Sequence, residues 1–159
     1  MKMKRSFSLV LAILLVLTCL PMKTQAAQIA SGTCGENLTW VLDDAGTLVI
    51  SGTGDMYQYG PKKNAPWYDL RDRIENLMID SEVTGIGAFA FNGCGMLNGV
   101  SLTEDLTSIG AGAFANCTSL SSLALPDKIT AIADSVFENC YGLTSIVFPK
   151  ALTGIGNRA

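Results

Sequence analysis

The stretch LSSLALPDKITAIADSVFENC, residues 120–140, is one copy of a pattern that returns every 23 residues along the chain. Cys94, Cys117 and Cys140 mark this period, because they stand 23 residues apart. Other apolar columns keep the same step, namely Phe91, Phe114 and Phe137; Leu97, Leu120 and Leu143; Leu102, Leu125 and Phe148; and Ile86, Ile109, Ile132 and Ile155. A fixed period of about 20 to 50 residues is typical of a solenoid, in which one short unit stacks on copies of itself.

Each repeat combines two short extended pieces with a turn-forming stretch. Leu123 and Leu125 share one face of the first piece, and Pro126 ends it because proline cannot donate a ladder hydrogen bond. The second piece spans residues 129–132. Asp134 is a candidate N-cap for one or two helical turns, whose inward side chains are Val136, Phe137 and Cys140. We therefore predict a β-rich solenoid with short helical turns and parallel pairing between repeats.

The period also reveals a divergent first repeat, residues 66–86. Its matching positions are all apolar: Ile74, Leu77, Ile79, Val83 and Ile86. Trp67 and Tyr68 are expected to fill the aromatic position, while Arg71 at the thiol position predicts a corner open to solvent. In the other direction, the next Phe and Cys would fall past Ala159. We therefore expect a truncated last repeat and an uncapped C-terminal end through which the chain could self-associate.

The segment before the repeats predicts a β-hairpin. Leu38, Trp40 and Leu42 alternate with polar or smaller residues, residues 43–46 are expected to form a Gly-containing turn, and Leu48 and Ile50 alternate again. Because the open end of a solenoid exposes apolar core, this hairpin is well placed to cap it. Residues 51–65 are rich in turn-forming residues and are expected to form a loop.

The first 26 residues predict a signal peptide. A basic start is followed by an apolar run from Phe7 to Leu20, and small residues precede the expected cleavage after Ala26. An uncleaved anchor is the alternative, although the run is shorter than the ~20 residues of a spanning helix. A lipoprotein signal at Cys19 is a third reading, for which Leu17 and Thr18 match poorly. The domains are thus signal peptide 1–26, cap and loop 27–65, and repeats 66–159.

The charge of the remaining chain excludes one class of partner. The sequence has 11 basic and 14 acidic residues, and the signal peptide holds four of the basic ones, which leaves 11 − 4 = 7. Nucleic-acid binding draws its affinity from Lys and Arg displacing counterions, so an acidic chain disfavours it. We expect contact with a membrane only during export.

The residue types for most catalytic and metal chemistry are missing. The chain has no His and no C-x-x-C pair, so Ser-His-Asp and Cys-His catalysis and zinc binding are not expected. The periodic cysteines should be buried thiols, and Cys34 is either free or paired. Two acidic groups, Asp43 with Asp44 and Asp69 with Asp72 and Glu75, have the composition of carboxylate pairs. Turn geometry and a solvated face explain them better, so we predict no enzyme activity and no cofactor.

These motifs resemble the BspA-like leucine-rich repeats of secreted bacterial proteins. The resemblance rests on the spacing of Leu120, Leu123, Leu125, Pro126, Ile129, Ile132, Phe137 and Cys140, with Thr103 in place of proline in the preceding repeat. Residues 31–54 and 65–67 also resemble the leader found before such repeats. The resemblance implies an extracellular or cell-wall-associated protein whose leucine-rich-repeat solenoid mediates adhesion or binding.

Two surfaces are candidate binding sites. Strand residues that point away from the core form a column on the concave sheet face: Met78, Ser101, Ala124 and Val147. Small residues could equally be there only because a parallel sheet tolerates them. The second candidate is an aromatic loop with Tyr57, Tyr59 and Trp67, since exposed aromatics often anchor ligands. Packing of Trp67 against the first repeat is the alternative.

Together these features predict a secreted or cell-surface, non-catalytic module. Its expected partner is an extracellular protein or a cell-wall or host glycan. One alternative is the N-terminal targeting or binding portion of a larger secreted enzyme whose catalytic domain lies beyond residue 159. The other is a structural spacer without a ligand.

Overall fold

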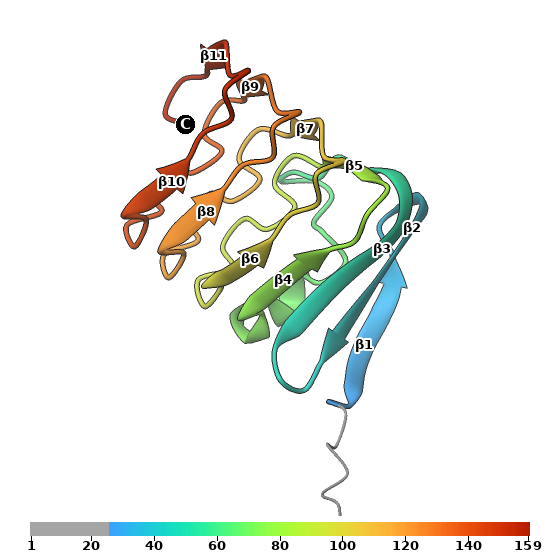
Figure 1. Ribbon diagram of the computed structural model, residues 1–159. Helices are drawn as coiled ribbons and strands as arrows, with labels where there is room; N and C mark the ends of the chain where they lie inside the picture. The colour runs from blue at the N-terminus through green and yellow to red at the C-terminus, as the bar shows by residue number, and fades with distance from the viewer. Residues whose placement is uncertain (1–25) are drawn as a thin grey trace, which may run out of the picture.

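A computed structural model describes residues 26–159, so the predicted signal peptide lies outside the described residues except for Ala26. The chain forms successive turns stacked side by side, with two rows of short strands along the stack (Figure 1). No helix within residues 26–159 is long and apolar enough to cross a membrane.

Three strands at the N-terminal end form an antiparallel unit. They are β1 (Gln28–Thr33), β2 (Gly35–Asp43) and β3 (Thr47–Met56). The β2–β3 turn is held by Asp43, whose Oδ1 accepts hydrogen bonds from the backbone N–H groups of Ala45 and Thr47, at 3.1 and 2.8 Å. The hairpin expected from the sequence is thus part of a larger unit, because β1 adds a third strand.

The expectation of a loop over residues 51–65 was partly wrong, because β3 continues to Met56. Gly52 and Gly54 have φ values of +114° and +93°, a region that glycine enters without a steric penalty. Gly54 and Asp55 pair with Val83 and Gly85 of β5 (Val83–Ile86) in the first repeat, with a register shift between the two pairs. Gly52 and Gly54, which look like turn residues in the sequence, therefore lie within strand β3, and β5 pairs with the last part of this strand.

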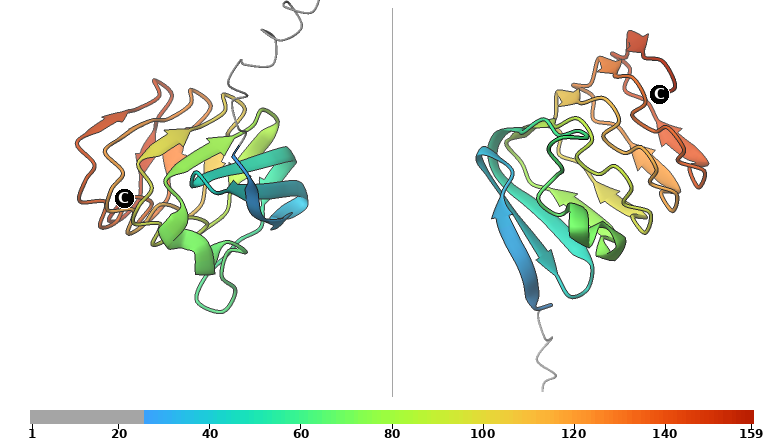
Figure 2. Two further views of the ribbon diagram at one scale, coloured as in Figure 1. Left: turned by 90° about the horizontal axis from the view of Figure 1, so that it is seen from below. Right: turned by 180° about the vertical axis from the view of Figure 1, so that it is seen from behind.

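The repeats supply two rows of parallel strands. The first row holds β4 (Asn76–Ile79), β6 (Gly99–Ser101), β8 (Ser122–Ala124) and β10 (Ser145–Val147). The second holds β5 (Val83–Ile86), β7 (Ser108–Ile109), β9 (Ala131–Ile132) and β11 (Gly154–Ile155). Paired residues such as Met78 with Ser101 are 23 positions apart. β3 joins the first row by pairing in parallel with β4 (Figure 2).

The strand ladders are interrupted once along the stack. β4 pairs with β6, and β8 pairs with β10, but no ladder joins β6 to β8 among the described strands. Backbone hydrogen bonds on the third side continue across this junction, from Gly112 N to Asp134 O at 3.0 Å and from Phe114 N to Val136 O at 3.0 Å. The turn side therefore keeps the repeats joined where the strand side does not.

The helical turns expected after Asp134 were wrong, since residues 134–139 form turns without a helix. Within the repeats, the backbone adopts positive φ at two positions, and positive φ interrupts a right-handed helix. Residues at equivalent positions in successive repeats form two groups. The first group is Phe89, Gly112, Ser135 and Arg158, and the second is Gly93, Asn116 and Asn139. Asp134 Oδ1 instead accepts a hydrogen bond from Asn157 N in the next repeat, at 2.7 Å. The helix in the described repeats is a 3-10 helix, η2 (Tyr68–Arg73).

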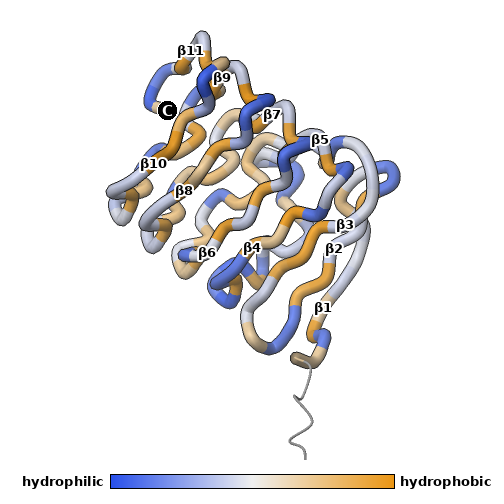
Figure 3. Tube along the Cα trace, in the orientation of Figure 1, coloured by the Kyte–Doolittle hydropathy of each residue, from blue (hydrophilic) through white to orange (hydrophobic). Residues whose placement is uncertain are grey.

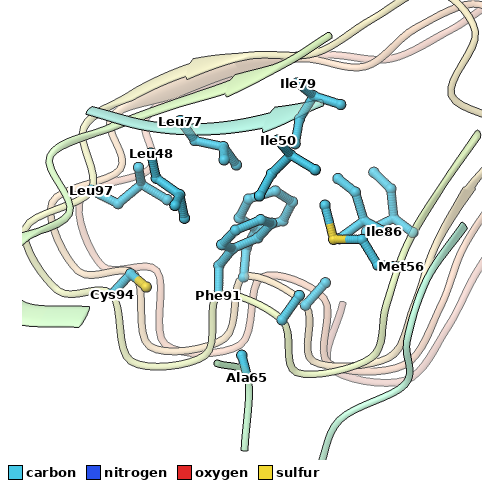
Figure 4. Packing of buried hydrophobic residues seen from close by; sticks show 14 of the residues in the cluster. Leu48, Ile50, Met56, Ala65, Leu77, Ile79, Ile86, Phe91, Cys94 and Leu97 are labelled. Atoms are coloured by element: carbon cyan, nitrogen blue, oxygen red, sulfur yellow. The ribbon is translucent and has the colours of Figure 1, made fainter. Parts of the chain in front are cut away.

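A column of aromatic rings forms the centre of the core. Successive rings stack nearly parallel, with centroid distances of 5.5, 5.3 and 6.0 Å, in the order Trp67, Phe91, Phe114 and Phe137. Leucine and isoleucine side chains from both rows of strands surround Phe91 (Figure 4). Trp67, and not Tyr68, therefore takes the aromatic position of the first repeat. Arg71 lies over the Tyr68 ring, with its Cζ atom 4.3 Å from the ring centroid.

Candidate binding surfaces

The sheet face brings the four predicted strand residues into one line, the sheet-face row. Met78, Ser101, Ala124 and Val147 are all exposed. Met78 pairs with Ser101, and Ala124 pairs with Val147, while the missing β6–β8 ladder separates the two pairs. Val49 on β3 pairs with Met78 and extends the row onto the N-terminal unit. Sequence reasoning missed Val49, because the parallel pairing of β3 with β4 was not expected.

On one side of this row, two residues earlier along each strand, the side chains carry no charge, whereas on the other side the exposed carboxylate of Asp80 accepts a hydrogen bond from Ser51 Oγ at 2.7 Å. In the neighbouring register positions Asn76 pairs with Gly99, and Ser122 pairs with Ser145. Apolar residues lie along the strands of this row, whereas hydrophilic residues gather where the chain passes from this row to the second row (Figure 3). The sheet face can therefore offer van der Waals contact and neutral hydrogen bonds to a partner.

The aromatic loop candidate requires a correction. Tyr59 is 7% exposed and Trp67 only 1%, so neither ring is presented to a ligand. Tyr59 Oη donates a hydrogen bond to Cys34 O at 3.2 Å, and Trp67 Nε1 donates one to Ala90 O at 2.8 Å. Burial raises the pKa of Tyr59 well above its ordinary value. Trp67 is a member of the aromatic column, and Tyr59 meets its ring edge-on at the end of that column.

Tyr57 remains on the surface, with 43% of its area exposed. Lys63 Nζ lies 4.7 Å from its ring centroid, within the range of a cation–π contact. A second exposed aromatic, Phe89, was missed by sequence reasoning. Its signal was present in the period, because the equivalent positions in the next two repeats are Gly112 and Ser135.

The thiol column is arranged for packing. Cys94 and Cys117 are buried, and Cys140 is partly buried. Cys117 Sγ donates to Phe91 O at 3.2 Å, and Cys140 Sγ donates to Phe114 O at 3.1 Å. Burial raises the pKa of Cys94 to about 12 and also raises that of Cys117. A thiol becomes a good nucleophile or metal ligand only as a thiolate, so these environments work against both roles.

Cys34 is also a buried free thiol, and its pKa is raised to about 12 by burial. Within residues 26–159, no group of three or more Cys, Asp or Glu side chains is placed to hold a metal ion. The carboxylate of Asp43 is engaged in the β2–β3 turn, and Asp44 Oδ1 accepts a hydrogen bond from Ala27 N at 2.8 Å. These acidic residues thus have structural partners.

The repeat pattern and the stacked fold place the chain among leucine-rich-repeat proteins. The family described as "BspA type Leucine rich repeat region" matches residues 67–159 in six copies, and the chain belongs to this family. No curated protein matches the chain.

Two solved structures of bacterial leucine-rich repeat proteins are similar to it. The protein from Eubacterium ventriosum is 33% identical with a TM-score of 0.62, over 79% of this chain and 40% of that one. The protein from Bacteroides ovatus is 25% identical with a TM-score of 0.54, over 69% of this chain and 33% of that one. The match therefore covers well under half the length of each of these two solved chains.

Proposed function

We propose that this chain is a secreted or cell-surface module that binds an extracellular protein or a cell-wall or host glycan through the sheet-face row. The observation that carries the proposal is the uncharged row itself, in which the half-buried Val49 and the exposed Met78 and Ser101 are in register across three strands. Membership of the BspA-type repeat family supports a binding role. The predicted signal peptide supports export, although it lies outside the described residues.

In the proposed arrangement residues 27–65 cap a solenoid of 23-residue repeats, residues 66–159. Two contacts support this division. β3 pairs in parallel with β4, which satisfies the strand edge of the first repeat. Trp40 and Tyr59 also meet Trp67 edge-on, at centroid distances of 5.7 and 6.2 Å, and cover the end of the aromatic column.

The proposed module acts by binding and not by catalysis. The sequence contains no His, which removes the commonest general base. The raised pKa values of Cys94 and Cys117 keep these thiols protonated near neutral pH. The adhesive role would then depend on surface shape and hydrogen bonding along the sheet face.

Arginine substitution within one repeat provides the test. Ala124 lies in the sheet-face row on β8, and Ala131 is an exposed alanine on β9 in the second row. The secreted chain is screened against immobilised extracellular-matrix proteins and cell-wall glycans. We expect a saturable ligand whose binding falls at least tenfold in Ala124→Arg, since a bulky charge replaces a contact in the row. The matched variant Ala131→Arg should bind like the parent.

Two results would contradict this function. Equal loss in Ala124→Arg and Ala131→Arg would show that binding does not use the sheet face. Turnover of a glycan or peptide substrate by the purified chain, abolished by substitution of a single acidic residue, would show that the module is an enzyme.

A further inference from the structure

Positive charge is concentrated in one short segment of an otherwise acidic chain. Residues 27–159 contain seven Lys and Arg and 14 Asp and Glu, and residues 60–73 hold four of the basic residues but only two of the acidic ones. Within the described chain, ion pairs join Lys128 to Asp105 and Arg158 to Glu138. Lys62 and Lys63 are exposed and form neither of these pairs. Two adjacent lysines that take part in neither ion pair therefore lie on the surface of the described chain.

These lysines lie on a tight loop beside two exposed aromatic rings. Gly60 and Lys63 exchange backbone hydrogen bonds at 3.0 and 2.9 Å, which closes the loop. Lys63 Nζ lies over the Tyr57 ring, and a Cβ placed on Gly60 would contact Phe89 Cδ2 at 4.0 Å. Tyr59 N donates to Ala88 O at 3.0 Å, which fixes the loop against the residue before Phe89. The loop protrudes from the stack between β3 and η2 (Figure 2, left).

Phe89 occupies a conformation that is costly for its side chain. Its φ is +54°, in the left-handed region, where a bulky residue is an outlier. The next repeat has Gly112 at the equivalent position, and a Cβ on Gly112 would lie only 2.6 Å from Phe89 Cε1. The missing side chain of Gly112 thus makes room for the ring, which still stays 38% exposed. Ser135 and Arg158 also adopt positive φ at this position, so the turn belongs to the repeat, and the feature particular to this repeat is a bulky aromatic ring held at the surface.

We propose that Tyr57, Lys62, Lys63 and Phe89 form a binding patch, the aromatic-lysine patch, for an acidic polysaccharide. Aromatic rings offer flat apolar surfaces to the C–H faces of sugar rings, and the ammonium groups pair with carboxylate or sulfate groups on the same polymer. A neutral glycan would use the rings without needing the lysines. Nucleic acid binding would instead use Lys and Arg along a track of successive phosphates, whereas four of the seven basic residues lie in the one short segment 60–73.

The patch is separate from the sheet-face row and does not depend on it. The row consists of strand residues, whereas the patch lies on the loop after β3 and at the turn after β5. The two surfaces can therefore be tested independently, and Ala124→Arg should leave binding at the patch unchanged.

The experiment titrates the secreted chain with three defined probes and follows binding by calorimetry. Heparin oligosaccharides carry sulfate, oligogalacturonate carries carboxylate, and dextran oligosaccharides are neutral. We expect saturable binding of at least one acidic probe, weakened by added salt because exposed charges are screened, and no comparable binding of dextran. The acidic probe that binds more tightly identifies the preferred anionic group.

Substitutions then separate the two parts of the patch. Phe89→Gly replaces the ring by glycine, which the next repeat has at the equivalent position as Gly112, so the fold should be retained. We expect Phe89→Gly, Tyr57→Ala and the double variant Lys62→Gln with Lys63→Gln each to weaken binding about tenfold, the range of a contact residue. Tyr141→Ala and Lys150→Gln are matched controls, since Tyr141 is 81% exposed and both lie in a later repeat. Their affinities should stay within about twofold of the parent.

Several results would overturn the proposal. They are the absence of saturable binding of both acidic probes, equal binding of dextran, and unchanged affinity in the lysine double variant. Equal binding of poly-glutamate would show that the patch recognises any polyanion and not an acidic sugar. A loss in Ala124→Arg as large as that in Phe89→Gly would place the glycan on the sheet face.

Discussion

The junction between the first repeat and the N-terminal unit differs from the junctions between later repeats. Between repeats the rings are nearly parallel, as for Phe91 and Phe114 at an interplanar angle of 22°. At the N-terminal junction Trp40 meets Trp67 at 76°. Where two repeats meet, both have the same backbone turn, so their rings lie face to face. At the N-terminal junction, Trp40 belongs to the antiparallel unit and approaches Trp67 from another direction. The period therefore determines ring geometry only where a repeat neighbours a repeat.

The thiol position shows the same contrast. Cys117 Sγ reaches the carbonyl of Phe91, and Cys140 Sγ reaches that of Phe114. The equivalent carbonyl in the first repeat belongs to Tyr68, and it accepts a hydrogen bond from Arg71 Nη1 at 2.8 Å. Among the described hydrogen bonds, none is donated by Cys94 Sγ. Arg71, which stands at the thiol position of the first repeat, thus uses the carbonyl that would otherwise be available to the thiol of Cys94.

The largest effect is expected at the centre of the aromatic column. Phe114→Ala should lower the free energy of unfolding by about 3–5 kcal/mol, because a fully buried ring leaves a cavity. Trp67→Phe should cost about 1–2 kcal/mol, since a ring still stacks on Phe91 while the hydrogen bond to Ala90 O is lost. Urea unfolding measures both. Equal losses would mean that the N-terminal junction depends on the indole as strongly as the repeats depend on their rings.

High pH should destabilise the fold through its buried thiols. The folded pKa of Cys94 is raised to about 12, whereas an unfolded thiol titrates near ~8.5. The unfolded chain therefore loses this proton first, and the stabilisation present below pH ~8.5 is lost as pH rises towards 12. The slope is about 1.4 kcal/mol per pH unit for each such thiol. Urea unfolding between pH 8 and pH 10.5, under reducing conditions, measures it.

Cys94→Ala is the control for this pH dependence. It should flatten the slope by the share of one thiol, while the contributions of the other groups whose pKa values burial raises remain, namely Cys34, Tyr59, Cys117 and Cys140. Parallel curves for parent and variant would contradict the raised pKa of Cys94.

A pair of serine substitutions tests the difference between the first and later thiols. Cys94→Ser should cost about 1–3 kcal/mol, since it buries a hydroxyl beside a carbonyl that Arg71 already uses. Cys117→Ser should cost less, about 1 kcal/mol, because its hydroxyl can donate to Phe91 O. Chemical denaturation of the two variants gives the difference directly. A larger loss for Cys117→Ser would show that the carbonyl of Phe91 does not satisfy the hydroxyl.

The sequence predicted most reliably what depends on the period. It led to the repeat family, to the column of Phe91, Phe114 and Phe137, and to the exposure of Met78 and Val147. These features follow from neighbours at a constant separation, so reading one repeat describes the next.

The features that the sequence did not predict depend on contacts without a period. Gly52 and Gly54 have the composition of a turn, yet the distant strand β5 keeps β3 extended. Asp134 is a residue type that is common at helix N-caps, but its carboxylate accepts a hydrogen bond from Asn157 N in the next repeat. In the candidate site, Tyr59 is buried because it covers the column end, and Phe89 is exposed because Gly112 leaves room beside it. Such placements require the three-dimensional neighbours.

The smallest effect is expected at Thr103, which stands where later repeats have Pro126 and Pro149. The turns are alike, because Leu106 N donates to Thr103 O at 3.2 Å and Ile129 N donates to Pro126 O at 3.1 Å. The described backbone hydrogen bonds include none donated by Thr103 N, so proline would remove only the bond from Asp105 N to Thr103 Oγ1.

Restriction of the unfolded chain by a compatible proline contributes about 0.4–1 kcal/mol. We therefore expect Thr103→Pro to leave stability unchanged or to raise it by less than about 1 kcal/mol. Thr107→Pro is the contrasting variant, since Thr107 N donates to Thr84 O at 2.8 Å and proline would break that bond. Thermal and urea unfolding of both variants give the comparison. A loss in Thr103→Pro as large as that in Thr107→Pro would show that the backbone at residue 103 differs from that at Pro126, and that the interrupted ladder between β6 and β8 reflects a different turn.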